Sequence, residues 1–167
     1  MVTESDLYVT KRGDKGKESL NIDKIHSMVG YATEGITGVS ASHVEMNSGI
    51  QFFDGINTED IQQILIKSAN DLISLESPNY QYVAARLLLF SLRKKLFHRL
   101  WEHPKFVDQI KTCVDAGVYD KAILENYTEA EIDRMGMWVD HERDYTFTYA
   151  GLRQVMDKYL VQDRSTG

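Results

Sequence analysis

Cations and glycines near the start of the chain are spaced in a way that could bind phosphate groups. Lys11 and Arg12 follow a short extended run at 7–10, and a turn with two glycines leads to a second extended run at 18–20. Backbone N–H groups in a glycine-bearing turn, with cations on either side, suit a polyphosphate at the end of a helical domain. Solvated hairpin turns have the same composition, so this motif alone leaves both interpretations open.

Two other groups of side chains invite a chemical interpretation, and a structural one is favoured for each. Residues 140–144, Asp-His-Glu-Arg-Asp, could bind a metal ion, but ligands normally come from separate elements and Arg143 would oppose a cation. A salt-bridged cap or an interface is the preferred interpretation of this segment. Cys113 could be a thiol nucleophile beside His98 or His103, but a lone cysteine among apolar residues is usually a small core residue.

The first elements that must position these side chains are two helices. Asn21 or Asp23 can cap a helix that runs to about Glu34, because the apolar residues in this stretch follow the helical period. Ser40 and Ser42 are predicted to open a second helical segment, and Ser42-x-x-Glu45 matches a capping box. The phosphate-binding turn would therefore lie directly before the first helix.

Two longer helices are expected next. Thr58 is predicted to cap the third helix, with acidic residues in the first turn and an apolar stripe along one side. Pro78, at the first helical position, opens a fourth helix over 79–100 that is apolar on most sides and is expected at the centre of a bundle. Shorter helical pieces are expected at 104–115, 119–124, 128–137 and 147–158. The basic residues of the fourth helix gather towards its C-terminal end, where they would complement the helix dipole: Arg86, Arg93, Lys94, Lys95 and Arg99.

Composition excludes several classes of protein. The 167 residues are 43% hydrophobic and 26% charged, which is ordinary for a globular chain long enough to bury a core. The net charge is −6, so general nucleic-acid binding is not expected. No apolar run approaches the roughly 20 residues of a membrane span, and no signal peptide is recognisable at the start. One cysteine cannot form an internal disulfide and fits a reducing compartment, so a cytoplasmic location is expected.

Five motifs occur in an order that resembles a known family. They are VTKR at 9–12, ESLNIDKI at 18–25, DGINTEDI at 54–61, YQYVAAR at 80–86 and LRKK at 92–95. Together they resemble the ATP-cone, the regulatory nucleotide-binding domain at the N-terminus of the large (alpha) subunit of class I ribonucleotide reductases. The likeness continues through 119–120, 127–131, 140–144 and 158–161, which resemble the segment that leads into the catalytic barrel of that subunit.

The resemblance implies a mainly α fold with two parts. An ATP-cone at 5–101 would be a four-helix bundle capped by a small β-sheet or hairpin. A helical segment at 102–167 would precede a catalytic barrel that is absent from this chain. The effector would be ATP or dATP with Mg²⁺, and the protein itself would supply no further metal site.

The resemblance also implies a role for each site residue. Lys11, Arg12, Lys24 and Lys94 would meet the phosphates, while Glu18 and Asn21 would contact the base or ribose. Thr58 would contact the ligand from the start of the third helix. An apolar slot would hold the base, lined by Leu20, Ile25, Phe52 and Ile61. Gln62 belongs to the same site, and Gln62 and Ser91 stand where some regulated members carry histidine near the effector.

The implied function is allosteric. This chain would be the ATP- and dATP-binding part of a ribonucleoside-diphosphate reductase large subunit, and its partners would be the remainder of that subunit and the radical-generating small (beta) subunit. The family uses three cysteines for catalysis, so a chain with one cysteine is expected to carry no catalytic residue. One alternative is a nucleotide-sensing or structural adaptor module with a decayed cone. Another, a stand-alone transcriptional regulator, would need a cysteine quartet and a basic surface.

Overall fold

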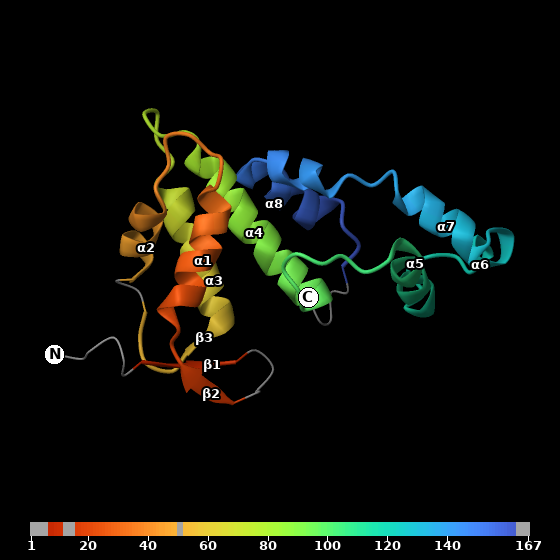
Figure 1. Cartoon of the computed structure of the whole chain (residues 1–167), viewed down its shortest axis with the longest axis horizontal. Coiled ribbons are helices and arrows are strands. Elements are labelled where there is room, and N and C mark those ends of the chain that lie inside the picture. Colours follow the sequence, from red (N-terminus) through yellow and green to blue (C-terminus); the bar gives the residue numbers. More distant parts are fainter. Residues whose placement is uncertain (1–6, 12–15, 50–51, 163–167) are drawn as a thin grey trace.

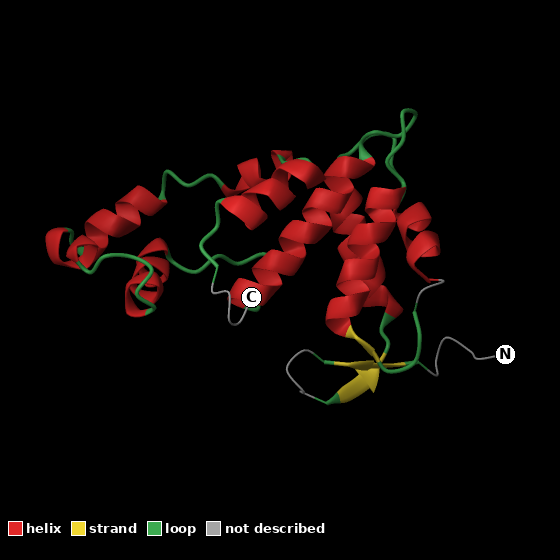
Figure 2. Cartoon of the chain, turned by 180° about the vertical axis from the view of Figure 1, so that it is seen from behind, coloured by secondary structure: helices red, strands yellow, loops and turns green. Residues whose placement is uncertain are grey.

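A small three-stranded sheet caps one end of the molecule. The computed structural model describes residues 7–11, 16–49 and 52–162. The central strand β1 (Tyr8–Thr10) pairs antiparallel with β2 (Lys17–Ser19) and parallel with β3 (Ile56–Asn57). Figures 1 and 2 show the sheet at the end of a helical bundle. The sequence predicted the first two strands to within one residue but did not predict β3, which has only two residues and depends on its pairing with β1.

Four helices form the bundle behind this sheet. They are α1 (Ile22–Thr33), α2 (Ala41–Gly49), α3 (Thr58–Asp71) and α4 (Tyr80–Phe97). The α4 helix packs extensively against α3 and buries apolar residues on several sides, among them Val83, Leu87 and Phe90. The structure therefore confirms the predicted helical bundle, the small sheet and the central position of the fourth helix.

Several predicted helix boundaries were wrong by one to three residues; for example, α6 begins at Ala122 rather than at residue 119, and α4 ends at Phe97 rather than at residue 100. The side chain of Asn57, not Thr58, caps α3, because its oxygen accepts the Glu59 N–H at 2.8 Å. The second helix begins at Ala41, directly after Ser40, so Ser40 fits the prediction, whereas Ser42 lies inside the helix and is not its N-cap. The fourth helix begins at Tyr80, so Pro78 precedes the helix rather than opening it. The boundaries of a helix depend on the path of the backbone as well as on the types of the residues near its ends.

Helices α5 (Phe106–Asp115), α6 (Ala122–Asn126) and α7 (Glu129–Gly136) form a lobe apart from the bundle. The lobe has its own small core, in which Val107, Ile110 and Ile132 are buried. The predicted capping box at Thr128 and Glu131 is confirmed at the start of α7. These hydrogen bonds, first the one from the Thr128 backbone, hold the pKa of the Glu131 carboxyl below its usual value.

The chain then returns from the lobe to the bundle. A 3₁₀-helix, η2 (His141–Thr146), and helix α8 (Tyr149–Lys158) both contact α4, and Leu152 of α8 is buried in the bundle core. Figure 1 shows α8 beside α4. Among the described residues, no helix is long and apolar enough to cross a membrane. The division of the chain at residue 101 stays a prediction.

Candidate functional site

One carboxylate links the hairpin to the first helix. Glu18 of β2 forms ion pairs with Lys11, at 2.8 Å, and with Lys24 of α1, at 3.6 Å. The hydrogen bond from Lys11 is the main reason why the pKa of the Glu18 carboxyl lies below its usual value. All three side chains reach solvent, and such exposed pairs are weak. A polyanion could therefore replace Glu18 as the partner of either lysine. The predicted Arg12 lies outside the described residues.

The start of α1 is fixed by a predicted site residue. Asn21 has an extended backbone, and its side-chain oxygen accepts the N–H of Lys24 at 3.0 Å. This cap sets the direction of the first turn of α1, and with it the direction of the Lys24 side chain. The N-terminal turn of a helix also favours anions, because its free N–H groups carry partial positive charge.

The predicted residue Thr58 lies at the same end of the molecule. Thr10 of β1 and Asn57 of β3 are partners in the parallel register. Lys11 and Thr58 each follow one of these paired residues, so the sheet brings them next to each other. Thr58 is half-buried as the first residue of α3. The three-stranded sheet thus brings the N-terminal turns of α1 and α3 close together.

A hollow of about 340 Å³ brings three predicted residues together. It lies between the start of α1 and the end of α4, where Lys24 and Lys94 approach it from opposite helices. Asn21 and Asp23, at the start of α1, also line the hollow. Ser27, Met28, Tyr31, Leu100 and Trp101 complete the lining. The hollow thus combines two cations with apolar and aromatic side chains.

The predicted apolar slot forms part of the bundle core. Ile25 and Ile61 are buried in the core cluster, and Leu20 and Phe52 are partly buried against it. Gln62 is buried as well, and its side-chain oxygen accepts a hydrogen bond from Ser91 at 3.4 Å. These residues lie beneath the sheet, and they are not among the side chains that line the hollow described above.

Sequence reasoning missed the two aromatic residues of this hollow. Tyr31 and Trp101 contact each other edge to face, with ring centroids 4.8 Å apart. The spacing of Lys24, Met28 and Tyr31 places them on one face of α1, so the sequence carried a signal for Tyr31. Trp101 lies after the end of α4, and its position depends on the path of the connection rather than on any periodicity.

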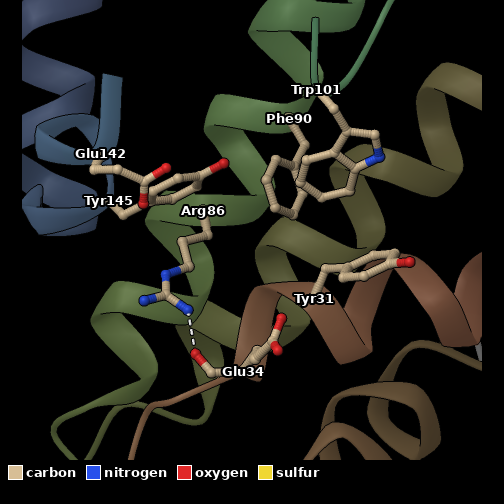
Figure 3. Close-up of a pocket in the computed structure, with 7 residues that line it drawn as sticks. All are labelled: Tyr31, Glu34, Arg86, Phe90, Trp101, Glu142 and Tyr145. Carbon is tan, nitrogen blue, oxygen red and sulfur yellow. Dashed lines mark hydrogen bonds between the residues drawn. The ribbon is translucent and has the colours of Figure 1, made fainter. Parts of the chain in front are cut away.

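The same two aromatic residues also line a second hollow of about 370 Å³. Figure 3 shows Arg86 of α4 in it, with a hydrogen bond of 2.6 Å to the backbone oxygen of Glu34. The guanidinium group of Arg86 also lies 5.5 Å from the centre of the Tyr145 ring. Arg86 therefore satisfies a carbonyl just past the end of α1 and contacts η2, instead of complementing the dipole of its own helix.

The acidic segment at 140–144 has structural partners. Asp140 caps η2 by accepting the Glu142 N–H at 3.1 Å, and Asp144 forms an ion pair of 2.9 Å with Arg93. No group of three or more possible metal ligands occurs in the described part of the chain. Cys113 is half-buried in α5, where the side chain of Gln109 contacts its sulfur at 3.6 Å.

Comparisons with known proteins point to one family. A family model described as the ATP cone domain matches residues 7–95. The chain is 50% identical over 162 residues to ribonucleoside-diphosphate reductase 1 subunit alpha of Escherichia coli (strain K12), covering 97% of this chain and 21% of that protein. It is 43% identical over 150 residues to the ribonucleoside-diphosphate reductase subunit alpha of Enterobacteria phage T4, covering 90% of this chain and 20% of that protein. The chain thus spans about a fifth of the length of these relatives.

Proposed function

Because this chain belongs to the ATP-cone family, which its residues 7–95 match, we propose that it binds ATP and dATP as allosteric effectors of a ribonucleoside-diphosphate reductase. The observation that carries the proposal is the shared hollow of Lys24, Lys94 and Asn21 at the sheet end of the bundle. Lys24 of α1 and Lys94 of α4 both line this hollow, next to the N-terminus of α1. This local concentration of positive charge occurs in a chain whose net charge is −6.

The phosphate groups would lie between the two helices. A triphosphate carries about three to four negative charges and binds best where several charge-assisted hydrogen bonds converge. Lys24 and Lys94 would supply two of these, and Lys11 would turn from Glu18 towards the same ligand. Thr58 would add a hydroxyl group from the start of α3. Asp23 is the one carboxylate among the described residues that line the hollow, so phosphate oxygens would supply most of the ligands of the accompanying Mg²⁺.

The base would lie on the sheet side of α1. The slot implied by the resemblance consists of Leu20 and Phe52, packed against the core that contains Ile25 and Ile61. Glu18, directly before this slot, is an acceptor for a base amino group or a ribose hydroxyl. Binding of this kind would order the hairpin. The ion pairs that Glu18 forms with Lys11 and Lys24 would be replaced by contacts of these three side chains with the ligand.

The regulatory role requires other parts of the enzyme. Cys113 is the single cysteine of the chain, whereas ribonucleotide reduction in this family uses three, so the reaction would occur elsewhere. The partners would be the remaining part of the large subunit and a radical-generating beta subunit, in the cytoplasm of a bacterial or phage-infected cell. An effector acts on them only if it binds two conformations of the assembly with different affinities.

Calorimetric titration of the chain with Mg-ATP and with Mg-dATP tests this proposal. The wild-type chain should bind each nucleotide saturably. Lys24→Gln should weaken binding by about tenfold or more, since it removes one charge-assisted hydrogen bond worth roughly 1.5–3 kcal/mol. Lys67→Gln is the matched control, because Lys67 is a helical lysine of α3 with 65% of its side chain exposed, against 68% for Lys24. No saturable binding would contradict the proposal and favour an adaptor with a decayed cone.

A further inference from the structure

The lobe formed by α5, α6 and α7 joins the bundle through two short segments of chain. The first, at 98–105, leads from α4 into α5, and the second, at 137–140, leads from α7 into η2. Figure 1 shows the lobe at the far end of both segments. Within the lobe, Val107 donates its N–H to Asp133 at 3.3 Å and Lys111 pairs with Glu129 at 2.6 Å, so α5 and α7 are tied to each other. The orientation of the lobe on the bundle therefore depends on the contacts of the two segments.

Two histidines, one from the first segment and one from the end of the second, lie directly against each other. His103 and His141, the first residue of η2, have parallel rings with centroids 3.5 Å apart. Phe97, at the end of α4, contacts the His103 ring edge to face, with centroids 6.1 Å apart. These three rings connect the end of the bundle to both segments. We call the stacked pair of His103 and His141 the clasp.

The bundle side of each segment is held by contacts of its own. In the first segment, the ring of Trp101 lies edge to face against Phe90 and Tyr31, with centroids 5.1 and 4.8 Å apart. After the second segment, Asp144 of η2 pairs with Arg93 of α4 at 2.9 Å. Separation of the clasp would therefore move the chain beyond these contacts, which is the lobe, and leave the bundle as it is.

The stacked arrangement is compatible with at most one charged ring. Two imidazolium groups at this distance would repel each other strongly. Burial first, and then the charge of His141, lower the pKa of His103 below its ordinary value. A histidine that is free of such contacts titrates near about pH 6.5. Protons therefore bind more readily when the rings are apart, and the share of the separated form rises as the pH falls below about 6.5.

The charged groups around the clasp do not offset a second proton. Arg93 of α4 disfavours protonation of His103 and Asp144 of η2 favours it, and these two groups pair with each other. Lys105 of the first segment and Asp133 of α7 line the cavity of about 460 Å³ that both histidines border, and their charges are opposite. The four charges sum to zero, so none of them compensates for two imidazolium groups.

The carboxylates that adjoin His141 in the sequence serve other contacts. Asp140 caps η2, because its side-chain oxygen accepts the Glu142 N–H at 3.1 Å. Glu142 lines the hollow around Arg86, as Figure 3 shows. The repulsion between the two rings is thus not relieved by an acidic group held for that purpose.

We propose that His103 and His141 form a pH-sensitive clasp that fixes the orientation of the lobe on the bundle. With the rings stacked, the clasp holds the two connecting segments together. With both imidazoles protonated, the rings separate and the lobe turns about the anchored residues Trp101 and Asp144. The ratio of open to closed clasp changes by about tenfold per unit of pH for each extra proton that the open form binds. The device goes beyond the proposed nucleotide binding and does not require it.

Single-molecule energy transfer between the lobe and the bundle tests the proposal. One dye is attached at Lys67→Cys in α3 and the other at Lys121→Cys, directly before α6, in a chain that also carries Cys113→Ser. Both lysine side chains are exposed, by 65% and 79%. As the pH falls from about 7.5 to about 5, a second population with a different transfer efficiency should appear. Its ratio to the first should rise by about tenfold or more, with the helical circular dichroism unchanged.

Two substitutions distinguish a titrating clasp from a purely structural contact. In His103→Phe the new ring can stack on His141 but binds no proton, so the second population should be absent at the lower pH. His141→Phe is the reciprocal variant and should have the same effect. His26→Phe is the matched control, because His26 is an exposed histidine of α1 within the bundle, and this variant should open as the wild-type sequence does.

Several results would overturn the proposal. One is a transfer efficiency that does not change with pH when both histidines are present. Others are a second population that persists in His103→Phe and His141→Phe, or one that is lost in His26→Phe. A second population that appears together with a loss of helical circular dichroism would be acid unfolding and would overturn the proposal as well. All measurements are made without nucleotide, so their outcome is independent of whether the chain binds ATP.

Discussion

Replacing Asp144 with asparagine tests whether η2 is held against α4 by the ion pair between Asp144 and the buried Arg93. Arg93 is a charged residue with only 5% of its surface exposed, and its guanidinium group donates to the Asp144 carboxylate at 2.9 Å. It also donates to the Tyr145 hydroxyl at 3.0 Å and lies 5.3 Å from the centre of that ring. The substitution Asp144→Asn keeps the size of the side chain and one acceptor oxygen but removes the charge that balances Arg93.

The expected loss of stability follows from the burial of the two partners. Removing one partner of a fully buried pair costs about 3–5 kcal/mol. Asp144 is 37% exposed, so solvent screens the pair, and the Tyr145 contacts of Arg93 remain. We therefore expect a loss of about 1–2 kcal/mol, between the values for exposed and buried pairs. In a chain of this length such a loss lowers the melting temperature by about 2–8 °C.

Thermal unfolding followed by circular dichroism measures this change. Asp71→Asn is the matched control, because it removes the charge from the exposed Lys67–Asp71 pair at 2.7 Å. The control should lose no more than about 0.5 kcal/mol, as is usual for an exposed helical pair. Equal losses in the two variants, or none in Asp144→Asn, would refute the role assigned to Arg93.

Three further predictions concern the hairpin, the lobe and the connection between lobe and bundle. The pKa of Glu18, measured by NMR titration, should lie below that of an ordinary glutamate and should rise in Lys11→Gln. The ion pair stabilises the folded chain fully at pH values above the ordinary glutamate pKa, and this stabilisation is lost as the pH falls through the lowered pKa of Glu18. Thr128→Ala should remove about 1 kcal/mol from the lobe, seen as faster amide exchange in α7 and not in α3. Burial first, and then the charge of His141, whose ring is stacked at 3.5 Å, keep the pKa of His103 below its ordinary value. His141→Phe should therefore raise the pKa of His103 in part, and an unchanged pKa would contradict the effect assigned to His141.

Much of the fold could be predicted from the sequence, because its signals are local. The helical period, the cap at Asn21 and the capping box at Thr128 each act within a few residues, and the structure confirms them. The ordered motifs also identified the family, which the comparisons confirm. The cap at Asn57 was missed because Thr58, one residue later, is an equally good capping type.

The remaining features depend on contacts between distant residues. Arg93 and Asp144 are 51 positions apart, so the sequence pattern of α4 gave no sign that this arginine is buried against η2. Likewise, Trp101 reaches the hollow through the path of a connection, and only the fold places it beside Tyr31. Lys11 and Thr58 lie next to each other because β1 pairs with the two-residue strand β3, which has no sequence signal of its own.

Titration of the isotope-labelled chain with Mg-ATP, followed by amide NMR, tests the central claim most directly. Saturable shifts are expected on the first turns of α1 and α3, on β2 and around Lys94, with the lobe at 106–136 unaffected. Shifts that do not saturate, or that centre on the lobe and leave Lys24 and Lys94 unchanged, would contradict it.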